Sequence, residues 1–219
     1  MCGIAGIYDP VSPRPADELA RLAARMADTL VHRGPDEGQT WIDAEAGAAF
    51  AFRRLAIRDV SIAGRQPMTS ASGRSTIAYN GEIYSSDEVR ERMGSAAPRW
   101  RGHSDTEVLL EACETWGVER TLPQLIGMFA FALIDRPTRR LSLVRDRMGI
   151  KPLYWTRWGR GIAFASELRA LRILPGLELA VDRNALTAYV RHAYFPNPHT
   201  VYRGVHQLPP GHILSIGPG

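Results

Sequence analysis

The chain has 219 residues, 45% of them hydrophobic, and a formal net charge of +4 at pH 7, so it can bury a full core in one large domain or two small ones. Its two cysteines, Cys2 and Cys113, exclude a disulfide framework and a four-thiolate zinc site. It has no signal-peptide pattern, no apolar run of about 18 residues and no block of like charges, which predicts a cytoplasmic protein that binds neither membrane nor nucleic acid.

The first half of the chain is predicted to alternate strands with helices. Apolar residues recur between Leu19 and Leu30 with the spacing of an amphipathic helix. Ser104 and Glu107 form a capping box that begins a second helix, and Cys113 inside it is interpreted as a small buried apolar residue. The expected elements are, in chain order, a strand over residues 2–8, a helix over 16–31, strands over 39–42, 48–57 and 75–79, and a helix over 104–117.

The dipeptide Asn80-Gly81 follows the predicted strand over 75–79. Asn-Gly at the end of an apolar strand is a strong signal for a tight turn between two strands. The pattern therefore predicts a hairpin turn at this point.

The second half of the chain is predicted to consist mainly of short antiparallel strands joined by hairpins. Ser166-Glu167 and Asp182 are expected to cap two short helices. The expected strands cover residues 128–134, 141–145, 153–156, 162–165 and 212–216, and the helices end at 171 and 191. The strands of the whole chain thus form two groups, each bracketed by helices. This pattern predicts an α+β domain in which two antiparallel sheets pack face to face with helices outside.

Cys2 follows the initiator methionine and begins a short apolar run with glycine at positions 3 and 6. If Met1 is removed, as is usual when the second residue is small, Cys2 carries an α-amino group beside its thiol. An α-amino group titrates near pH ~8 and a free thiol near ~8.5, so the amine can take the thiol proton, as in N-terminal threonine hydrolases. Cys2 is therefore a candidate nucleophile with its own base. The simpler alternative is that it only begins a buried strand.

A set of sequence strings occurs in order along the whole chain. The strings are MCGIAG at residue 1, HRGPD at 32, RRLAI at 53, NGEIY at 80, SDTEV at 104, GMFAFALID at 127, RDRMGIKPLY at 145, FASEL at 164 and LPPGH at 208. With them the chain resembles the glutaminase domain of glutamine-hydrolysing asparagine synthetase, a class II glutamine amidotransferase of the N-terminal-nucleophile (Ntn) hydrolase type. The resemblance implies one such domain over residues 2–216, folded as a four-layer α/β/β/α sandwich, with the C-terminal synthetase domain absent.

The resemblance also implies roles for the residues that match the family's motifs. Cys2 is implied as the nucleophile, and Asn80 and Gly81 as the donors that stabilise an oxyanion. Arg54 is implied to pair with the α-carboxylate of glutamine, a task that suits a planar guanidinium. The other implied substrate-binding residues are Leu55, Ala56, Ile57 and Arg58, together with Glu82 and Asp105, which would face the substrate ammonium.

Other features of the sequence qualify these assignments. An acid at Asp105 is also favoured by the dipole of the predicted helix alone. Ser85 and Arg58 depart from the family pattern, in which asparagine and an apolar residue are common, and this concerns only details of the pocket. Lys151 is the single lysine of the chain, interpreted as a contact of a tight turn or of a synthetase partner. Residues 32–36 are expected to form a pocket-shaping loop, and the histidine spacing over 192–206 matches no usual metal site.

The implied function is hydrolysis of L-glutamine to L-glutamate and ammonia through a γ-glutamyl thioester on Cys2. This step is expected to need no metal or cofactor. ATP and Mg²⁺ are expected only in the synthetase domain, because the chain has no SGG-x-DS pyrophosphate loop. The implied partners are L-glutamine and an ATP-using asparagine-synthetase domain or subunit, and a homodimer is an open alternative. A non-catalytic glutamine-sensing or scaffold relative and a hydrolase of another amide are the competing interpretations.

Overall fold

The computed structural model describes residues 1–57, 59 and 61–218 of the chain. In this part of the chain the strands form two antiparallel sheets. The six-stranded sheet has the order β10 (Val205–Gln207), β8 (Tyr154–Trp158), β9 (Gly161–Ala165), β1 (Gly3–Tyr8), β3 (Ala48–Arg54) and β2 (Glu37–Asp43). The five-stranded sheet has the order β11 (Ile213–Ile216), β7 (Arg140–Arg145), β6 (Gly127–Asp135), β5 (Ser75–Ile83) and β4 (Met68–Thr69).

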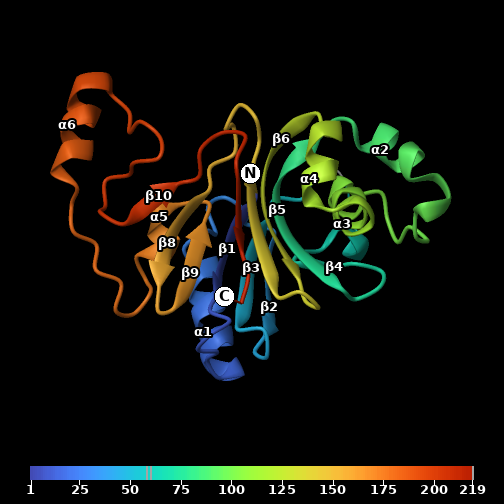
Figure 1. The fold of residues 1–219 in the computed structure, drawn as a ribbon, viewed down its shortest axis with the longest axis horizontal. Helices are drawn as coiled ribbons and strands as arrows, with labels where there is room; N and C mark the ends of the chain where they lie inside the picture. Colours follow the sequence, from blue (N-terminus) through green and yellow to red (C-terminus); the bar gives the residue numbers. More distant parts are fainter. Residues whose placement is uncertain (58, 60, 219) are drawn as a thin grey trace.

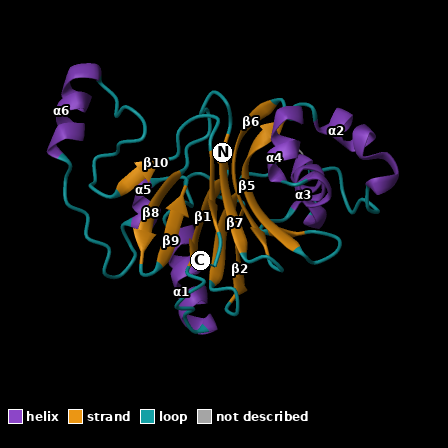
Figure 2. Cartoon of the chain, in the orientation of Figure 1, coloured by secondary structure: helices purple, strands orange, loops and turns teal. Residues whose placement is uncertain are grey.

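Helices cover the outer face of each sheet (Figures 1 and 2). The helices packed on the six-stranded sheet are α1 (Ala16–Asp28) and α5 (Leu168–Leu171). On the five-stranded sheet lies α3 (Asp105–Trp116), flanked by α2 (Ser86–Met93) and α4 (Val118–Thr121). The remaining helix, α6 (Arg183–His192), projects at the edge of the molecule beyond β10. The chain thus has the predicted four-layer α/β/β/α arrangement.

The alternation of side chains along β1 divides the core into layers. Ile4 and Tyr8 point into the layer between the two sheets, whereas Ala5 and Ile7 face α1 on the outside. Successive residues of a strand point to opposite faces. Cys2 therefore shares the face of Ile4 and packs against the inter-sheet core.

The same alternation sorts the residues of β5. Ala78 belongs to the inter-sheet core, whereas Ile77 and Tyr79 pack in the core beneath α3. Complete burial of a side chain such as Ile77, which is 0% exposed, stabilises the fold by about 1.5–3 kcal/mol. Asn80 accordingly points between the sheets, on the side of Cys2, and Tyr79 points toward the helix layer.

The predicted helix caps of α3 and α6 are confirmed. Ser104 Oγ accepts a hydrogen bond from Glu107 N (3.2 Å) at the start of α3, and Gly117 ends that helix with a φ of 85°. Asp182 caps α6 by accepting from two backbone N–H groups. Cys113 is buried as predicted, and burial raises the pKa of its thiol to about 12. Helix caps depend on residues close together in the sequence, so the sequence pattern was enough to predict them.

The predicted tight turn at Asn80-Gly81 is wrong. β5 continues to Ile83, and its pairing with β6 sets Gly81 opposite Phe129. A Cβ on Gly81 would lie 2.4 Å from Met128 O and 2.7 Å from Phe129 Cα. The glycine therefore permits the close approach of two strands rather than a turn.

Other differences are confined to the ends of elements and to short elements. β3 ends at Arg54 rather than at residue 57. Ser166 Oγ accepts from Ile4 N (3.0 Å) instead of capping α5, so the predicted cap at 166–167 is wrong. The sequence did not predict α2, α4, β4 or β10. The two strands have two and three residues and are too short for an alternation pattern. Within the described residues, no helix has the length and apolar character needed to cross a membrane.

Candidate active site

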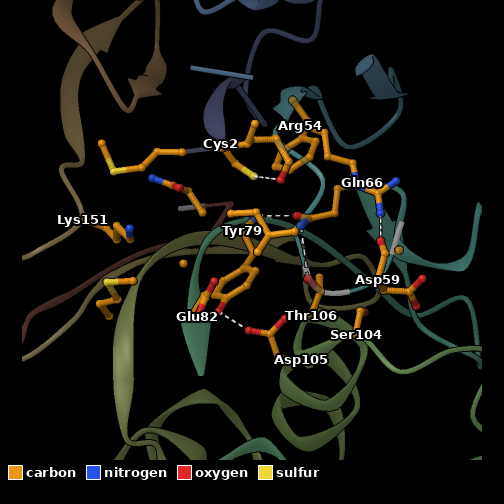
Figure 3. A pocket seen from close by; sticks show the side chains of 18 residues that line it. Cys2, Arg54, Asp59, Gln66, Tyr79, Glu82, Ser104, Asp105, Thr106 and Lys151 are labelled. Carbon is orange, nitrogen blue, oxygen red and sulfur yellow. Dashed lines mark hydrogen bonds between the residues drawn. The ribbon is translucent and has the colours of Figure 1, made fainter. Parts of the chain in front are cut away.

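A cavity of about 170 Å³ lies among β3, β5, the first turn of α3 and the segment that precedes β1 (Figure 3). The lining residues that the sequence assigned to the site are Cys2, Arg54, Leu55, Ile57, Asn80, Gly81, Glu82 and Asp105. Ala56 is not among the lining residues, and its backbone N–H donates to Asp36 Oδ2 (2.8 Å). Arg58 lies outside the described residues. The side chains that also line the cavity, and that the sequence did not assign to it, include Gln66, Tyr79, Thr106, Lys151 and Asp59.

Cys2 is half-buried at the wall of this cavity. Its Sγ donates a hydrogen bond to Leu55 O (3.7 Å). Arg33 Nε donates to the carbonyl oxygen of Cys2 (2.9 Å), and Arg33 Nη1 donates to Glu167 Oε1 (3.0 Å). The loop over 32–36 thus fixes the backbone of the candidate nucleophile.

The electrostatics of the cavity act on the Cys2 thiol in two directions. Burial raises the pKa of the thiol, while the positive charges of the N-terminus, Arg54 and Lys151 work against that rise. The net direction is upward, so the thiol is mainly protonated at neutral pH and needs a base to become a nucleophilic thiolate.

Lys151 reaches the cavity through a loop wound around the carboxylate of Asp146. Asp146 Oδ1 accepts from Met148 N and Ile150 N (both 3.0 Å), and Oδ2 accepts from Lys151 N (3.0 Å). Lys151 is only 5% exposed, and its side chain lies at the cavity (Figure 3). The structure thus sets the single lysine beside the candidate nucleophile, a location that the sequence did not predict.

Replacing Lys151 by methionine should raise the pKa of the Cys2 thiol further, because a positive charge near a thiol favours the thiolate. We expect alkylation of Cys2 by iodoacetamide near pH ~8 to slow several-fold in Lys151→Met. Lys151→Arg keeps the charge and should retain the parental rate. Labelling is followed by mass spectrometry, which separates Cys2 from the buried Cys113. An unchanged alkylation rate in Lys151→Met would contradict an action of the ammonium on the thiol.

Asn80 lines the cavity and carries an unused hydrogen-bond donor. The residue is 1% exposed, and its Nδ2 is buried without a hydrogen-bond partner in the described part of the chain. An unpaired buried amide donor costs about 1–3 kcal/mol, so it calls for an explanation. Asn80 lies on the inter-sheet face of β5, which explains why it lines the same cavity as Cys2. A ligand bound there can accept the hydrogen bond that Nδ2 lacks.

The backbone N–H of Gly81 faces the same region. Phe129 of β6 is the residue opposite Gly81. Its N–H donates to Asp146 Oδ2 (3.1 Å) and its carbonyl oxygen accepts from Asp146 N (2.8 Å), so both groups point away from β5. The pair is therefore a non-hydrogen-bonded one, and the N–H of Gly81 points away from β6. Tyr79 N and Ile83 N point to the same edge of β5, where they donate to Gln66 Oε1 (2.7 Å) and Asp105 Oδ2 (2.9 Å). The N–H of Gly81 lies between these two, at the edge that borders the cavity.

The guanidinium of Arg54 is held by its neighbours at one end of the cavity. Nη1 donates to Glu37 Oε2 (3.2 Å) and Ser61 O (3.3 Å), and Nη2 donates to Asp59 O. A Cβ on Gly64 would lie 2.6 Å from Nη2, so this glycine leaves the space that the guanidinium occupies. Arg54 thus borders the cavity with its donors directed at the carboxylate of Glu37 and at two backbone carbonyls.

Two acidic residues, Glu82 and Asp105, lie at the other end of the cavity (Figure 3). Asp105 is buried in the first turn of α3, and its Oδ2 accepts from Tyr79 Oη (2.7 Å) as well as from Ile83 N. The helix dipole favours an acid at this position, and the same carboxylate also lines the cavity. A guanidinium at one end and carboxylates at the other match the opposite charges of an amino acid.

The cavity residues that the sequence did not assign come from separate parts of the chain. Gln66 precedes β4, Tyr79 lies in β5 and Thr106 in α3, so only the fold brings them together. No group of three or more histidine, cysteine, aspartate or glutamate side chains placed to hold a metal occurs in the described residues. The arrangement therefore offers a thiol nucleophile, two hydrogen-bond donors and a charged clamp.

Comparison with known proteins identifies the family. A family model described as a glutamine amidotransferase domain matches residues 1–219. The glutamine-hydrolyzing asparagine synthetase 3 of Bacillus subtilis is 35% identical over 219 residues, which cover 99% of this chain and 35% of that protein. A putative glutamine-hydrolyzing asparagine synthetase of Mycobacterium bovis is 38% identical over 234 residues, again covering 99% of this chain and 35% of that protein.

A solved structure of the allosteric regulatory enzyme of purine biosynthesis has the same fold. It matches with a TM-score of 0.67 over 99% of this chain and 47% of that chain, at 19% sequence identity. The chain spans about a third of the length of the curated relatives named above. It therefore belongs to the family of glutamine amidotransferase domains that includes those of glutamine-hydrolysing asparagine synthetases.

Proposed function

We propose that the chain hydrolyses L-glutamine to L-glutamate and ammonia through a γ-glutamyl thioester on Cys2. The observation that carries this proposal is that Cys2 and Asn80 line one cavity and that the Nδ2 of Asn80 has no hydrogen-bond partner in the described residues. Acyl transfer needs a nucleophile and fixed donors for the oxyanion, and the cavity offers both.

The acylation half of the reaction begins with the α-amino group of Cys2, which is free once Met1 is removed. The amine takes the thiol proton, and Sγ attacks the side-chain amide carbon of glutamine. The amide oxygen becomes an oxyanion, for which Asn80 Nδ2 and the backbone N–H of Gly81 are the donors. The protonated amine then gives its proton to the leaving nitrogen, the C–N bond breaks, and ammonia departs.

The deacylation half uses the same amine as base. It takes a proton from water, and the resulting hydroxide attacks the thioester carbonyl. The C–S bond breaks, and the proton returns to Sγ as L-glutamate leaves. The cycle consumes one glutamine and one water and releases one glutamate and one ammonia.

The charged ends of the cavity provide the selectivity for an amino acid in this proposal. The substrate α-carboxylate pairs with Arg54 and takes the donors that now bond to Asp59 O and Ser61 O, since a carboxylate is a stronger acceptor than a backbone carbonyl. The α-ammonium pairs with Asp105 and Glu82. Leu55 and Ile57 line the cavity beside the substrate chain.

We also propose that the released ammonia serves an ATP-using asparagine-synthetase domain or subunit. The support is that the relative at 35% identity is named a glutamine-hydrolyzing asparagine synthetase and the relative at 38% identity a putative one, and that this chain covers 35% of each. ATP, Mg²⁺ and aspartate would act in that partner, while the glutaminase step uses only groups of this chain.

The test is an assay with amide-¹⁵N-labelled glutamine, with and without ATP, Mg²⁺ and aspartate. We expect the chain alone to release labelled ammonia at a rate that these additions do not change, and Cys2→Ala to release none. Mass spectrometry of the products identifies the fate of the label. Labelled asparagine from this chain alone would contradict the proposal that asparagine synthesis takes place in a partner domain or subunit. Glutamine binding without hydrolysis would favour the alternative of a glutamine-sensing protein.

A further inference from the structure

The hydroxyl of Tyr79 forms a buried contact with the acidic end of the cavity. Tyr79 is 2% exposed and lies on the helix-facing side of β5. Its Oη donates to Asp105 Oδ2 (2.7 Å), and Ile83 N donates to the same oxygen (2.9 Å). Both bonds end on Oδ2, so the carboxylate keeps its accepting capacity on Oδ1.

Gln66 forms hydrogen bonds both to Tyr79 and to Thr106, the residue that follows Asp105. Its Oε1 accepts from Tyr79 N (2.7 Å), and its Nε2 donates to Thr106 Oγ1 (3.2 Å). Gln66 is buried and ties β5 to the first turn of α3 next to Asp105. The backbone that carries the phenol and the helix that carries the carboxylate are therefore fixed relative to each other.

We propose that Tyr79 is a positioning residue that orients Asp105 so that Oδ1 faces the α-ammonium of the substrate. This inference rests on the proposed glutaminase function and deepens it, because it names the group that sets the selectivity for an α-amino acid. The terminal torsion of an aspartate is broad and nearly two-fold, so the carboxylate plane needs fixing from outside. Two donors on Oδ2, one a backbone N–H and one the phenol, fix that plane.

Of the two donors to Asp105 Oδ2, only the hydroxyl of Tyr79 can be removed by a side-chain substitution. Ile83 N is a main-chain donor of β5, which a substitution at Tyr79 does not remove. With this donor alone, the carboxylate can still rotate about its terminal torsion. Tyr79→Phe removes one oxygen and keeps the ring that packs in the core beneath α3. The backbone bond to Gln66 also persists, so the effect isolates the hydroxyl.

The experiment compares two ligands that differ only in the ammonium group. These are L-glutamine and glutaramate, which has the same amide and carboxylate but no α-amine. We expect Tyr79→Phe to raise the KM for glutamine about 10-fold, the size of effect of a hydrogen bond to a charged group, with kcat changed less than twofold. The kinetic constants for glutaramate should stay unchanged, so the preference for glutamine falls about 10-fold.

Tyr8→Phe is the matched control. Tyr8 is also a buried strand tyrosine, and its hydroxyl donates to Arg139 O, away from the cavity. We expect Tyr8→Phe to lower the melting temperature without changing the preference between the two ligands. An equal loss with glutamine and glutaramate in Tyr79→Phe, or an unchanged preference, would overturn the proposal and leave Tyr79 a purely structural residue.

Calorimetric binding to Cys2→Ala protein keeps this inference separate from the proposed hydrolysis. If the parental chain binds glutamine but does not turn it over, the proposed function fails while the ligand comparison still tests Tyr79 through Kd. If Tyr79→Phe in that background binds both ligands as the Cys2→Ala protein does, the positioning role is overturned whatever the catalytic outcome. If neither ligand binds, both proposals are overturned.

Discussion

A chain that keeps one residue on the amino side of Cys2 should hydrolyse glutamine about 10²- to 10⁴-fold more slowly than a chain that begins at Cys2, the range that a general base contributes. Burial raises the pKa of the Cys2 thiol, so little thiolate forms without a base. A free α-amino group titrates near pH ~8 and can act as that base, whereas an amide nitrogen cannot. Removal of Met1 also brings the positive terminus, which lowers the thiol pKa, onto Cys2 itself. Met1 lines the cavity, so its loss leaves more room in the cavity as well.

Two preparations from a cleavable N-terminal fusion test this expectation. Cleavage leaves Cys2 as the first residue in one and adds a single glycine before it in the other, and intact mass confirms each N-terminus. Glutamate release gives the rates, and glutamine binding to each preparation is the control for a blocked cavity. Equal turnover by the two preparations would show that the α-amine of Cys2 is not the base.

The sequence predicted those parts of the fold that depend on local patterns. The strand at 2–8, the Ser104 cap of α3 and the Asp182 cap of α6 need only neighbouring residues, and the structure contains them. The tight turn at Asn80-Gly81 failed because a pairing decides that position: β6 forms a nine-residue ladder with β5. Tertiary pairing overrides a dipeptide preference in such a case.

The candidate site was predictable where motifs carry it and not where distant segments meet. Cys2, Asn80 and Asp105 each stand in a recognisable string and line one cavity. The bond of Gln66 to Tyr79 spans 13 residues, and that of Tyr79 to Asp105 spans 26. The helix and strand periodicities of a sequence extend over only a few residues, so they cannot predict contacts at such separations. Lys151 was notable only as the single lysine, and its place at the cavity follows from a loop that folds around a carboxylate.

The orphan donor of Asn80 gives the second large expected effect. We expect Asn80→Ala to lower kcat about 10²- to 10³-fold, as loss of an oxyanion donor does, with a smaller change in KM, because the donor acts in the transition state. Its Nδ2 has no partner to lose in the described structure. The free energy of unfolding should therefore change by less than about 1 kcal/mol, because an unpaired buried donor is itself unfavourable.

Steady-state kinetics and denaturant unfolding of the same preparations decide this point. Arg54→Lys serves as the contrast, because loss of the planar guanidinium that pairs with the substrate carboxylate should chiefly raise KM. Asn184→Ala, at an exposed asparagine of α6, is the matched control and should leave both kinetic constants unchanged. If Asn80→Ala and Arg54→Lys gave the same kinetic signature, the two roles would be wrongly assigned. A loss of activity in Asn80→Ala that tracked a loss of stability would instead make Asn80 a structural residue, since a donor reserved for the oxyanion contributes to the rate and not to the fold.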